Sequence, residues 1–178
     1  MEKLNMSMDE IKNNISLIKD TWKNYSTTNC YAFALGLDVP EEKISENAYQ
    51  VGVLGAIKFG FDYIDLRIMS YEERLKLDLV ALNIELKEVG PDFDQVIKPY
   101  YSGGKKIYSE YNWPIALFES DNNVHFLRKK SDGIWYHKYG YGSFVMNIDR
   151  KGKIITDPEE CDLRDFKYKK TFLLTYTK

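Results

Sequence analysis

Cysteine and histidine are scarce in this chain of 178 residues, which contains only two of each. Two Cys cannot form a disulfide framework. Together with two His they also lack the close paired spacing of a structural zinc site, so we expect no metal and no other cofactor. If the protein uses Cys or His in chemistry, the residues available are Cys30, Cys161, His125 and His137.

The chain also lacks an excess of positive charge, because it contains 25 Lys and Arg and 27 Asp and Glu, which gives a net charge of −2. General nucleic-acid binders and proteins of anionic membrane surfaces need a basic surface, so neither class of partner is expected. The sequence contains no run of about 18 apolar residues. Its opening segment, MEKLNMSMDEIKNN, has no apolar core of the roughly 7 to 15 residues that a secretory signal needs. The sequence as written predicts a cytoplasmic protein, with export by another route or a removed signal as alternatives.

Apolar and aromatic residues are plentiful, at 44% and 15% of the chain. That content is sufficient for a buried core and far from the composition of disordered chains. Internal repeats and linkers rich in Pro, Gly or Ser are absent from the sequence. We therefore expect one domain over residues 1–178, and the sequence does not indicate its oligomeric state.

Helical patterns dominate residues 1–90. Apolar residues recur on one face over Ser7–Asn24, and Ile44–Lys58 also has the pattern of a helix. Ser70 followed by Glu73 forms a capping box, which predicts the start of another helix. The segment Asn83–Val89 alternates enough to be a strand.

A short helix is expected to begin near Cys30. Thr28 or Asn29 is a suitable N-terminal cap, apolar residues follow, and Gly36 can end the helix. Cys30 would then occupy the first helical turn.

Beyond Gly90 the pattern changes. Residues 91–112 contain two Pro, two adjacent Gly and several Tyr, and predict a long irregular loop with one helical turn near Val96, which could act as a lid over a substrate. From Trp113 onward the periodicity is that of strands, with turns at residues 131–133 and 149–152. The expected strands are Pro114–Glu119, Val124–Lys130, Ile134–Lys138, Ser143–Ile148, Lys153–Thr156 and Thr171–Thr177. Helices followed by an antiparallel sheet over 113–178 define an α+β fold.

The expected position of Cys30 favours a reactive thiol. Backbone N–H groups point outward at a helix start, so they stabilise a thiolate there. The alternative is a small buried residue that packs the helix start. Cys161 lies in a charged segment without such a setting, and we expect it to take no part in the chemistry.

The two His residues are expected to be neighbours in a hairpin. They flank the Ser131-Asp132-Gly133 turn and are an even number of positions apart, so their side chains share a face of the sheet. One imidazole would serve as a base for Cys30, while the other would accept a hydrogen bond from its distal nitrogen. One alternative is that both His residues are half-exposed hairpin residues without a role in chemistry. Another is that they bind a metal ion together with one Cys, although no further ligand is spaced to complete such a site.

The run Asn29-Cys30-Tyr31-Ala32, taken with the His125–Gly140 segment, resembles a bacterial and phage group of Cys-His proteins. That group is similar to papain-like cysteine hydrolases of the NlpC type and of the cysteine, histidine-dependent amidohydrolase/peptidase type. The resemblance covers the segment around Cys30 and residues from Trp113 onward. It implies a papain-like fold in which the nucleophile begins a helix that packs on the sheet.

The resemblance also implies roles for individual residues. Cys30 would be the nucleophile, His125 the general base and acid, and His137 the orienting residue. Asn147 is the alternative orienting residue, because papain uses an Asn on a later strand. The backbone N–H of Cys30 would bind the oxyanion together with a side-chain donor from Asn24, Tyr25 or Asn29.

The function implied is hydrolysis of an amide bond through a thioacyl intermediate, with a peptide or a peptidoglycan-like compound as substrate. NlpC-type proteins usually have Asp-Cys-Ser-Gly at the nucleophile, whereas this chain has Asn-Cys-Tyr-Ala, so the substrate stays open. A cytosolic deamidase or transglutaminase-like effector performs the same acyl transfer. The alternative outside enzymes is a binding protein that retains the fold without catalysis.

Overall fold

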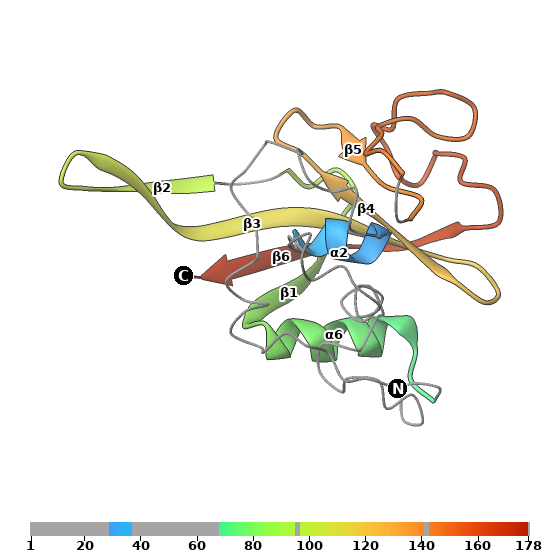
Figure 1. Ribbon diagram of the computed structural model, residues 1–178, viewed down its shortest axis with the longest axis horizontal. Helices are drawn as coiled ribbons and strands as arrows, with labels where there is room; N and C mark the ends of the chain where they lie inside the picture. The colour runs from blue at the N-terminus through green and yellow to red at the C-terminus, as the bar shows by residue number, and fades with distance from the viewer. Residues whose placement is uncertain (1–28, 37–67, 95–96, 141–142, 178) are drawn as a thin grey trace. The chain divides into compact units, whose positions relative to one another are not determined.

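A computed structural model of the chain describes residues 29–36, 68–94, 97–140 and 143–177 (Figure 1). The chain divides into two compact units, the first formed by residues 1–82 and 138–145 and the second by residues 83–137 and 146–178. The described helices belong to the first unit and the described strands to the second. The helices predicted over Ser7–Asn24 and Ile44–Lys58 lie outside the described residues.

Helix α2 (Cys30–Leu35) belongs to the first unit and has the predicted ends. Asn29 is its N-cap, and the following residues from Tyr31 to Leu35 are all buried. Gly36 ends the helix in the left-handed conformation with φ of 70°, which glycine adopts without a steric cost. The prediction of a short helix that begins at Cys30 is confirmed.

Helix α6 (Tyr71–Ala81) begins with the predicted capping box. The Glu73 backbone N–H donates to the Ser70 hydroxyl at 3.2 Å, and the Ser70 N–H donates to the Glu73 carboxylate at 2.7 Å. Leu75 and Leu79 lie one turn apart and are both buried, so they mark the buried face of α6. The chain leaves α6 at Leu82 and enters the sheet at Ile84.

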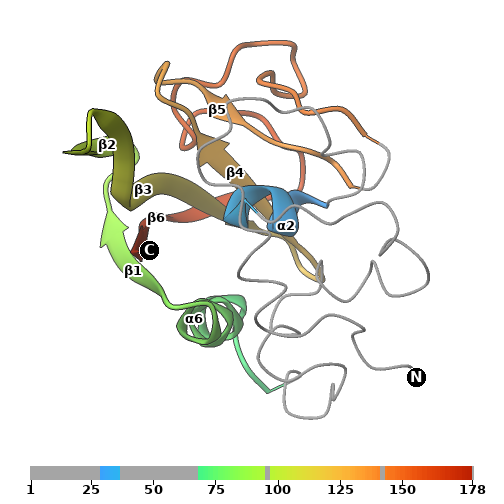
Figure 2. The same ribbon diagram turned by 60° about the vertical axis from the view of Figure 1, so that its left-hand side comes forward.

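The second unit is built on one antiparallel sheet in which β3 is the central long strand (Figures 1 and 2). The order is β1-β6-β3-β4-β5, and β2 also pairs with β3. Strand β6 runs along one edge of β3, while β2 and β4 follow one another along the other edge. The strands are β1 (Ile84–Val89), β2 (Ile97–Ser102), β3 (Lys105–Glu119), β4 (Val124–Lys129), β5 (Trp135–Tyr136) and β6 (Lys167–Thr177). Helices and an antiparallel sheet together give the α+β fold class that the sequence predicts.

The irregular loop predicted over residues 91–112 is wrong, because most of this segment forms the β2–β3 hairpin. Gly103 and Gly104 have φ of 58° and 76°, and two successive positive φ values make the tight turn that suits a two-residue hairpin. Pro99 is accommodated where the register shifts between Lys98 and Pro99. The Tyr residues of this segment therefore lie on the strands of a hairpin and not on an irregular loop.

The later strands are shorter or longer than the sequence predicts. The predicted strand Ile134–Lys138 is reduced to β5, whereas the final strand begins at Lys167 instead of Thr171. In place of the strands predicted over Ser143–Ile148 and Lys153–Thr156, the backbone forms only the single bridges His137–Met146 and Ile148–Ile154. Loops with isolated backbone pairs thus fill the region between β5 and β6.

The hairpin between β4 and β5 has the predicted turn and register. Arg128 pairs with Tyr136 and Lys129 with Trp135, and Gly133 adopts a positive φ of 80° in the turn. One face of this region joins a hydrophobic cluster that also includes residues of the following loops. The cluster consists of Ala116, Phe118, Leu127, Trp135, Ile155 and Leu163.

Candidate active site

Cys30 is the first residue of α2, and its neighbour Asn29 fixes the geometry of this helix start. The Asn29 Oδ1 accepts a hydrogen bond from the Ala32 N–H at 2.9 Å, and the Asn29 carbonyl accepts from the Phe33 N–H at 3.0 Å. Cys30 itself is half-buried, in contrast to the fully buried residues that follow. The thiol is therefore placed where helix N–H groups stabilise negative charge.

Lys138 supplies a positive charge near Cys30, and sequence reasoning missed it. Both residues belong to the first unit, and the Lys138 side chain is fully buried. Burial lowers the pKa of Lys138 to about 8, while its electrostatic interaction with Cys30 acts in the opposite direction. Opposite charges favour the ionised form of each partner, so this lysine favours the Cys30 thiolate. The sequence places Lys138 in an expected strand, and nothing in that pattern indicates its burial.

Tyr31 anchors α2 to α6 within the first unit. Its hydroxyl donates to the Asp78 carboxylate at 2.5 Å, and both side chains are buried. Burial raises the pKa of Tyr31 well above its usual value, and the negative charge of Asp78 adds to this effect. The hydrogen bond fixes the residue that directly follows Cys30.

The two His residues form a hydrogen-bonded pair in the second unit. His125 Nε2 lies 2.9 Å from His137 Nδ1, with the rings nearly perpendicular and their centroids 5.2 Å apart. His125 lies on β4 and His137 directly follows β5, so the hairpin register brings them together. The prediction of neighbouring imidazoles is confirmed.

The hydrogen bonds of the pair determine which nitrogen carries each proton. His137 Nε2 lies 2.9 Å from the Ile148 carbonyl oxygen, which can only accept, so Nε2 carries the proton. In neutral His137 the other nitrogen, Nδ1, is then an acceptor and receives the Nε2–H of His125. Neutral His125 in turn has its lone pair on Nδ1. His125 Nδ1 is thus the nitrogen of this pair that can take up a proton without breaking either hydrogen bond.

Both imidazoles are neutral at pH 7. Burial lowers the pKa of His125 to about 3, and its electrostatic interactions with His137 and Arg150 act in the same direction. Burial also lowers the pKa of His137, although its hydrogen bond to Ile148 and the negative charge of Asp149 oppose this effect. A neutral imidazole is the form that a general base requires.

The other residues predicted for the site have different outcomes. Asn24 and Tyr25 lie outside the described residues. Asn29, the third predicted oxyanion donor, uses its side-chain oxygen Oδ1 to cap α2. Asn147 lies between the two residues that contact His137 through their backbone, Met146 and Ile148, but in the described part of the chain its side chain makes no hydrogen bond with either imidazole.

Cys161 has a contrasting environment in a loop of the second unit. Its thiol donates to the Pro158 carbonyl at 3.4 Å, and it packs against the hydrophobic cluster. Burial raises the pKa of Cys161 to about 12, and the nearby carboxylates of Asp149, Asp157 and Asp162 contribute in the same direction. At neutral pH a thiol with so high a pKa is almost entirely protonated, and a protonated thiol is not a nucleophile.

Within the described residues, no group of three or more His, Cys, Asp or Glu side chains is arranged to hold a metal ion. None of the helices in this part of the chain has the length and hydropathy needed to cross a membrane.

Comparisons with protein-family models, curated proteins and solved structures gave no match.

Proposed function

We propose that the protein is a papain-like cysteine hydrolase that cleaves an amide bond, with Cys30 as nucleophile, His125 as base and His137 as orienting residue. The observation that carries the proposal is the chain of hydrogen bonds from His125 through His137 to the Ile148 carbonyl. It holds His125 in the tautomer whose Nδ1 accepts a proton. This is the requirement for a base oriented by a third group.

The reaction follows from these roles. His125 Nδ1 takes the proton of the Cys30 thiol, and the sulfur attacks the carbonyl carbon of the amide. The tetrahedral intermediate collapses when the imidazolium returns the proton to the leaving nitrogen, which releases the amine and leaves a thioester on Cys30. Water, deprotonated by His125, then attacks the thioester to release the acid and restore the thiol.

The mechanism requires that Cys30 Sγ comes within reach of His125 Nδ1. The buried Lys138, which interacts electrostatically with Cys30, gives Cys30 a cationic neighbour, as an activated thiol needs.

The substrate class is a peptide or a peptidoglycan-like amide. A screen with peptidoglycan fragments and glutamine-containing peptides tests the proposal, using wild type, Cys30→Ala and the matched control Cys161→Ser. We expect turnover in wild type and Cys161→Ser and none in Cys30→Ala. Ammonia release from glutamine peptides would identify a deamidase. If Cys30→Ala retained the wild-type turnover of a cleaved substrate, the role of Cys30 would be wrong.

The orienting role is tested with variants of His137. His137→Leu removes the acceptor for His125 and should lower kcat at least tenfold with little change in KM, because His125 loses its tautomer. His137→Asn retains an acceptor oxygen and should recover part of the loss. Asn147→Ala should have a smaller effect, and the reverse order would assign the role to Asn147.

A further inference from the structure

The Ile148 carbonyl, which accepts the His137 proton, belongs to the same peptide group as the Asp149 N–H. A peptide group is planar, and this one is trans, so its C=O and N–H point in opposite directions. The carbonyl oxygen lies 2.9 Å from His137 Nε2, and the N–H donates to the Lys153 carbonyl at 2.9 Å. Contacts that hold the Asp149 N–H therefore also fix the direction of the Ile148 carbonyl.

The Asp149 side chain holds Lys153 at a second point. Its Oδ1 accepts from the Lys153 N–H at 3.0 Å, so Asp149 binds both polar backbone groups of Lys153. The same oxygen accepts from the Lys151 N–H at 2.8 Å, and Oδ2 accepts from the Asp162 N–H at 3.1 Å. One carboxylate thus closes the turn of residues 149–153 and ties this turn to the loop at Asp162.

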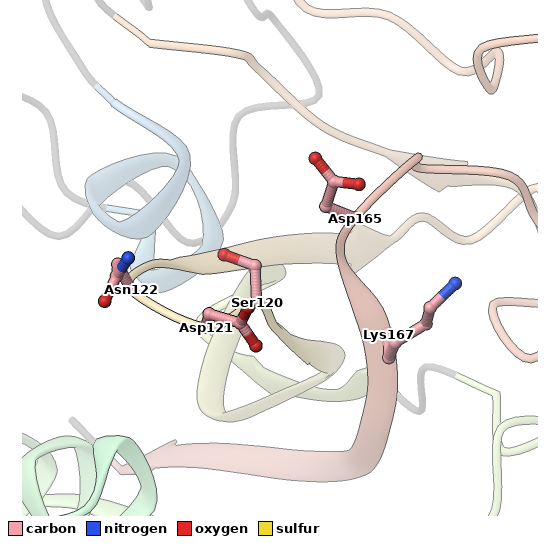
Figure 3. A pocket seen from close by; sticks show the side chains of 5 residues that line it. All are labelled: Ser120, Asp121, Asn122, Asp165 and Lys167. Carbon is pink, nitrogen blue, oxygen red and sulfur yellow. The ribbon is translucent and has the colours of Figure 1, made fainter.

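Asp149 is buried, in contrast to the acidic side chains at the surface of the second unit. It is only 8% exposed. Burial raises its pKa, but hydrogen bonds from three backbone N–H groups outweigh burial and lower the pKa overall, so the carboxylate is ionised at pH 7. Asp121 and Asp165 are exposed and line a polar pocket (Figure 3). The other residues that line this pocket are Ser120, Asn122 and Lys167.

Regular strand pairing contributes little to the position of the Ile148 carbonyl. Among the described residues, no strand lies between β5 and β6. Ile148 forms a single bridge with Ile154, and the Asn147 carbonyl accepts from the Ile155 N–H at 2.9 Å. Both partners follow the turn that Asp149 closes, so the geometry of this turn determines where they lie.

We propose that Asp149 is a positioning residue for the candidate base: by closing this turn it holds the Ile148–Asp149 peptide group so that the carbonyl keeps the proton on His137 Nε2. The bond from the Asp149 N–H to Lys153 also polarises the peptide group, which makes the Ile148 carbonyl a stronger acceptor. The inference rests on the proposed function for the role of His125. All of its contacts lie within the second unit.

Loss of the Asp149 carboxylate should change the tautomers of both imidazoles. If the Ile148 carbonyl turns away, His137 can carry its proton on Nδ1 and donate it to His125 Nε2. His125 then carries its own proton on Nδ1 and has no lone pair there. Asp149 therefore acts on His125 through the Ile148 carbonyl and His137.

NMR of the full chain, labelled with 15N in the histidine rings and without an added histidine tag, measures the tautomers directly. The chain contains only two His, so the spectrum contains four ring nitrogens. In wild type we expect Nε2 to be protonated and Nδ1 to be unprotonated in both rings. In Asp149→Ala the Nδ1–H form should reach at least about 10% in both rings together, because the hydrogen bond that opposes it is weakened.

Two further variants control this measurement. Asp149→Asn retains an oxygen that can accept from Lys151 and Lys153, so it should restore the wild-type tautomers. Asp157→Ala should leave them unchanged, since Asp157 accepts from the Glu159 N–H at 2.9 Å in a separate turn. If Asp149→Ala does not fold, Asp149→Ser takes its place, with the same expected change.

Three results would overturn the proposal. They are wild-type tautomers after loss of the Asp149 carboxylate, an equal change in Asp157→Ala, and no recovery in Asp149→Asn.

Kinetics separate positioning from general support of the fold. Asp149→Ala should lower kcat about threefold to tenfold with little change in KM, because only the orientation of the base is affected. In a chain that already carries His137→Leu, the same substitution should have no further effect on kcat, because the two residues act in series. An equal loss of kcat in both backgrounds would show a merely structural role.

Failure of this proposal and failure of the proposed function give different results. If an amide is turned over but Asp149→Ala retains the wild-type tautomers and kcat, the role of Asp149 is wrong and the hydrolase stands. If the tautomers change as expected but no amide is turned over, Asp149 positions the imidazole pair and the hydrolase is wrong.

Discussion

The two cysteines lie in environments of opposite charge. Cys30 begins helix α2, with backbone N–H groups around it and the buried Lys138 as a cationic neighbour. Cys161 lies in a loop, where its thiol donates a hydrogen bond to the Pro158 carbonyl and carboxylates, including that of Asp149, lie nearby. Neighbouring positive charge favours a thiolate and neighbouring negative charge opposes it. The surroundings of Cys30 therefore favour a thiolate, whereas those of Cys161 favour the protonated thiol.

The largest expected effect is the difference in alkylation between the two thiols. At pH 7.5 a thiol with a pKa of about 12 has roughly a thousandfold less thiolate than an ordinary thiol. Iodoacetamide should therefore modify Cys30 at least about a thousandfold faster than Cys161, as measured by mass spectrometry of the peptides. Cys161→Ser gives a chain with one thiol for the pH profile of Cys30. Equal alkylation rates at the two sites would show that the two thiols do not differ in reactivity. A pH profile of Cys30 alkylation centred near pH 8.5 and unchanged in His125→Ala would count against the proposal that the protein is an enzyme.

Acid should destabilise the unit that holds Cys161 and the imidazole pair. Both His residues have a lowered pKa in the folded chain, so between about pH 6.5 and the folded values the unfolded chain binds more protons. Stability is fully present above pH 6.5 and falls as the pH decreases, by up to about 1.4 kcal/mol per pH unit for each His. Urea unfolding at pH 7, 6 and 5 measures this slope. His125→Gln should reduce it, and an unchanged slope would show that His125 is not buried in its neutral form.

Replacing Lys138, the cationic neighbour of Cys30, should reduce the difference in alkylation rate between Cys30 and Cys161. Lys138→Met removes the positive charge while retaining a similar length of side chain, so the Cys30 alkylation rate at pH 7 should fall about tenfold. Lys138→Arg should recover part of the rate. The control is Lys76→Met, because Lys76 is exposed on α6 and paired with Glu72 at 3.0 Å. If both Met variants react at the wild-type rate, Lys138 has no influence on the thiol.

Two hydrogen-bonded tyrosines allow a comparison of stability: Tyr31 directly follows Cys30, and Tyr168 packs against the same hydrophobic cluster as Cys161. Tyr31→Phe removes the donor to buried Asp78 and should lower the free energy of unfolding by about 1–3 kcal/mol. The Tyr168 hydroxyl bonds Thr171 Oγ1 at 2.8 Å in a half-buried position, and Tyr168→Phe should cost about 0.5–1 kcal/mol. Chemical denaturation of the two variants under identical conditions compares them. A larger loss in Tyr168→Phe would place the more important anchor near Cys161.

Local signals predicted the two described helices and the hairpin that joins the His residues. Asn29 and Gly36 delimit α2, and Ser70 with Glu73 starts α6, because caps satisfy backbone groups within a few residues of themselves. The Asp132-Gly133 turn likewise fixes the register that brings His125 next to His137. Neither prediction depends on distant parts of the chain.

The sequence was less informative where the outcome depends on partners far away in the chain. Pro99 and the pair Gly103-Gly104 favour a loop when considered alone, yet a register shift and a tight turn accommodate them once β3 provides a partner strand. Burial of Lys138 arises because residues 138–145 join the first unit after the chain leaves β5. The carboxylates of Asp121 and Asp165 line one pocket only because β6 returns beside β3.

The position of β6 in the sheet has a consequence for the order of folding. This strand comprises residues 167–177, yet it lies between β1 and β3, which are made much earlier. Synthesis proceeds from the N-terminus at about 5–20 residues per second, so both neighbouring strands emerge before the strand that joins them. Until then each presents backbone groups that other chains can pair with. The second unit can therefore complete its sheet only after residues 167–177 have been synthesised, and until then the facing edges of β1 and β3 lack the strand that joins them.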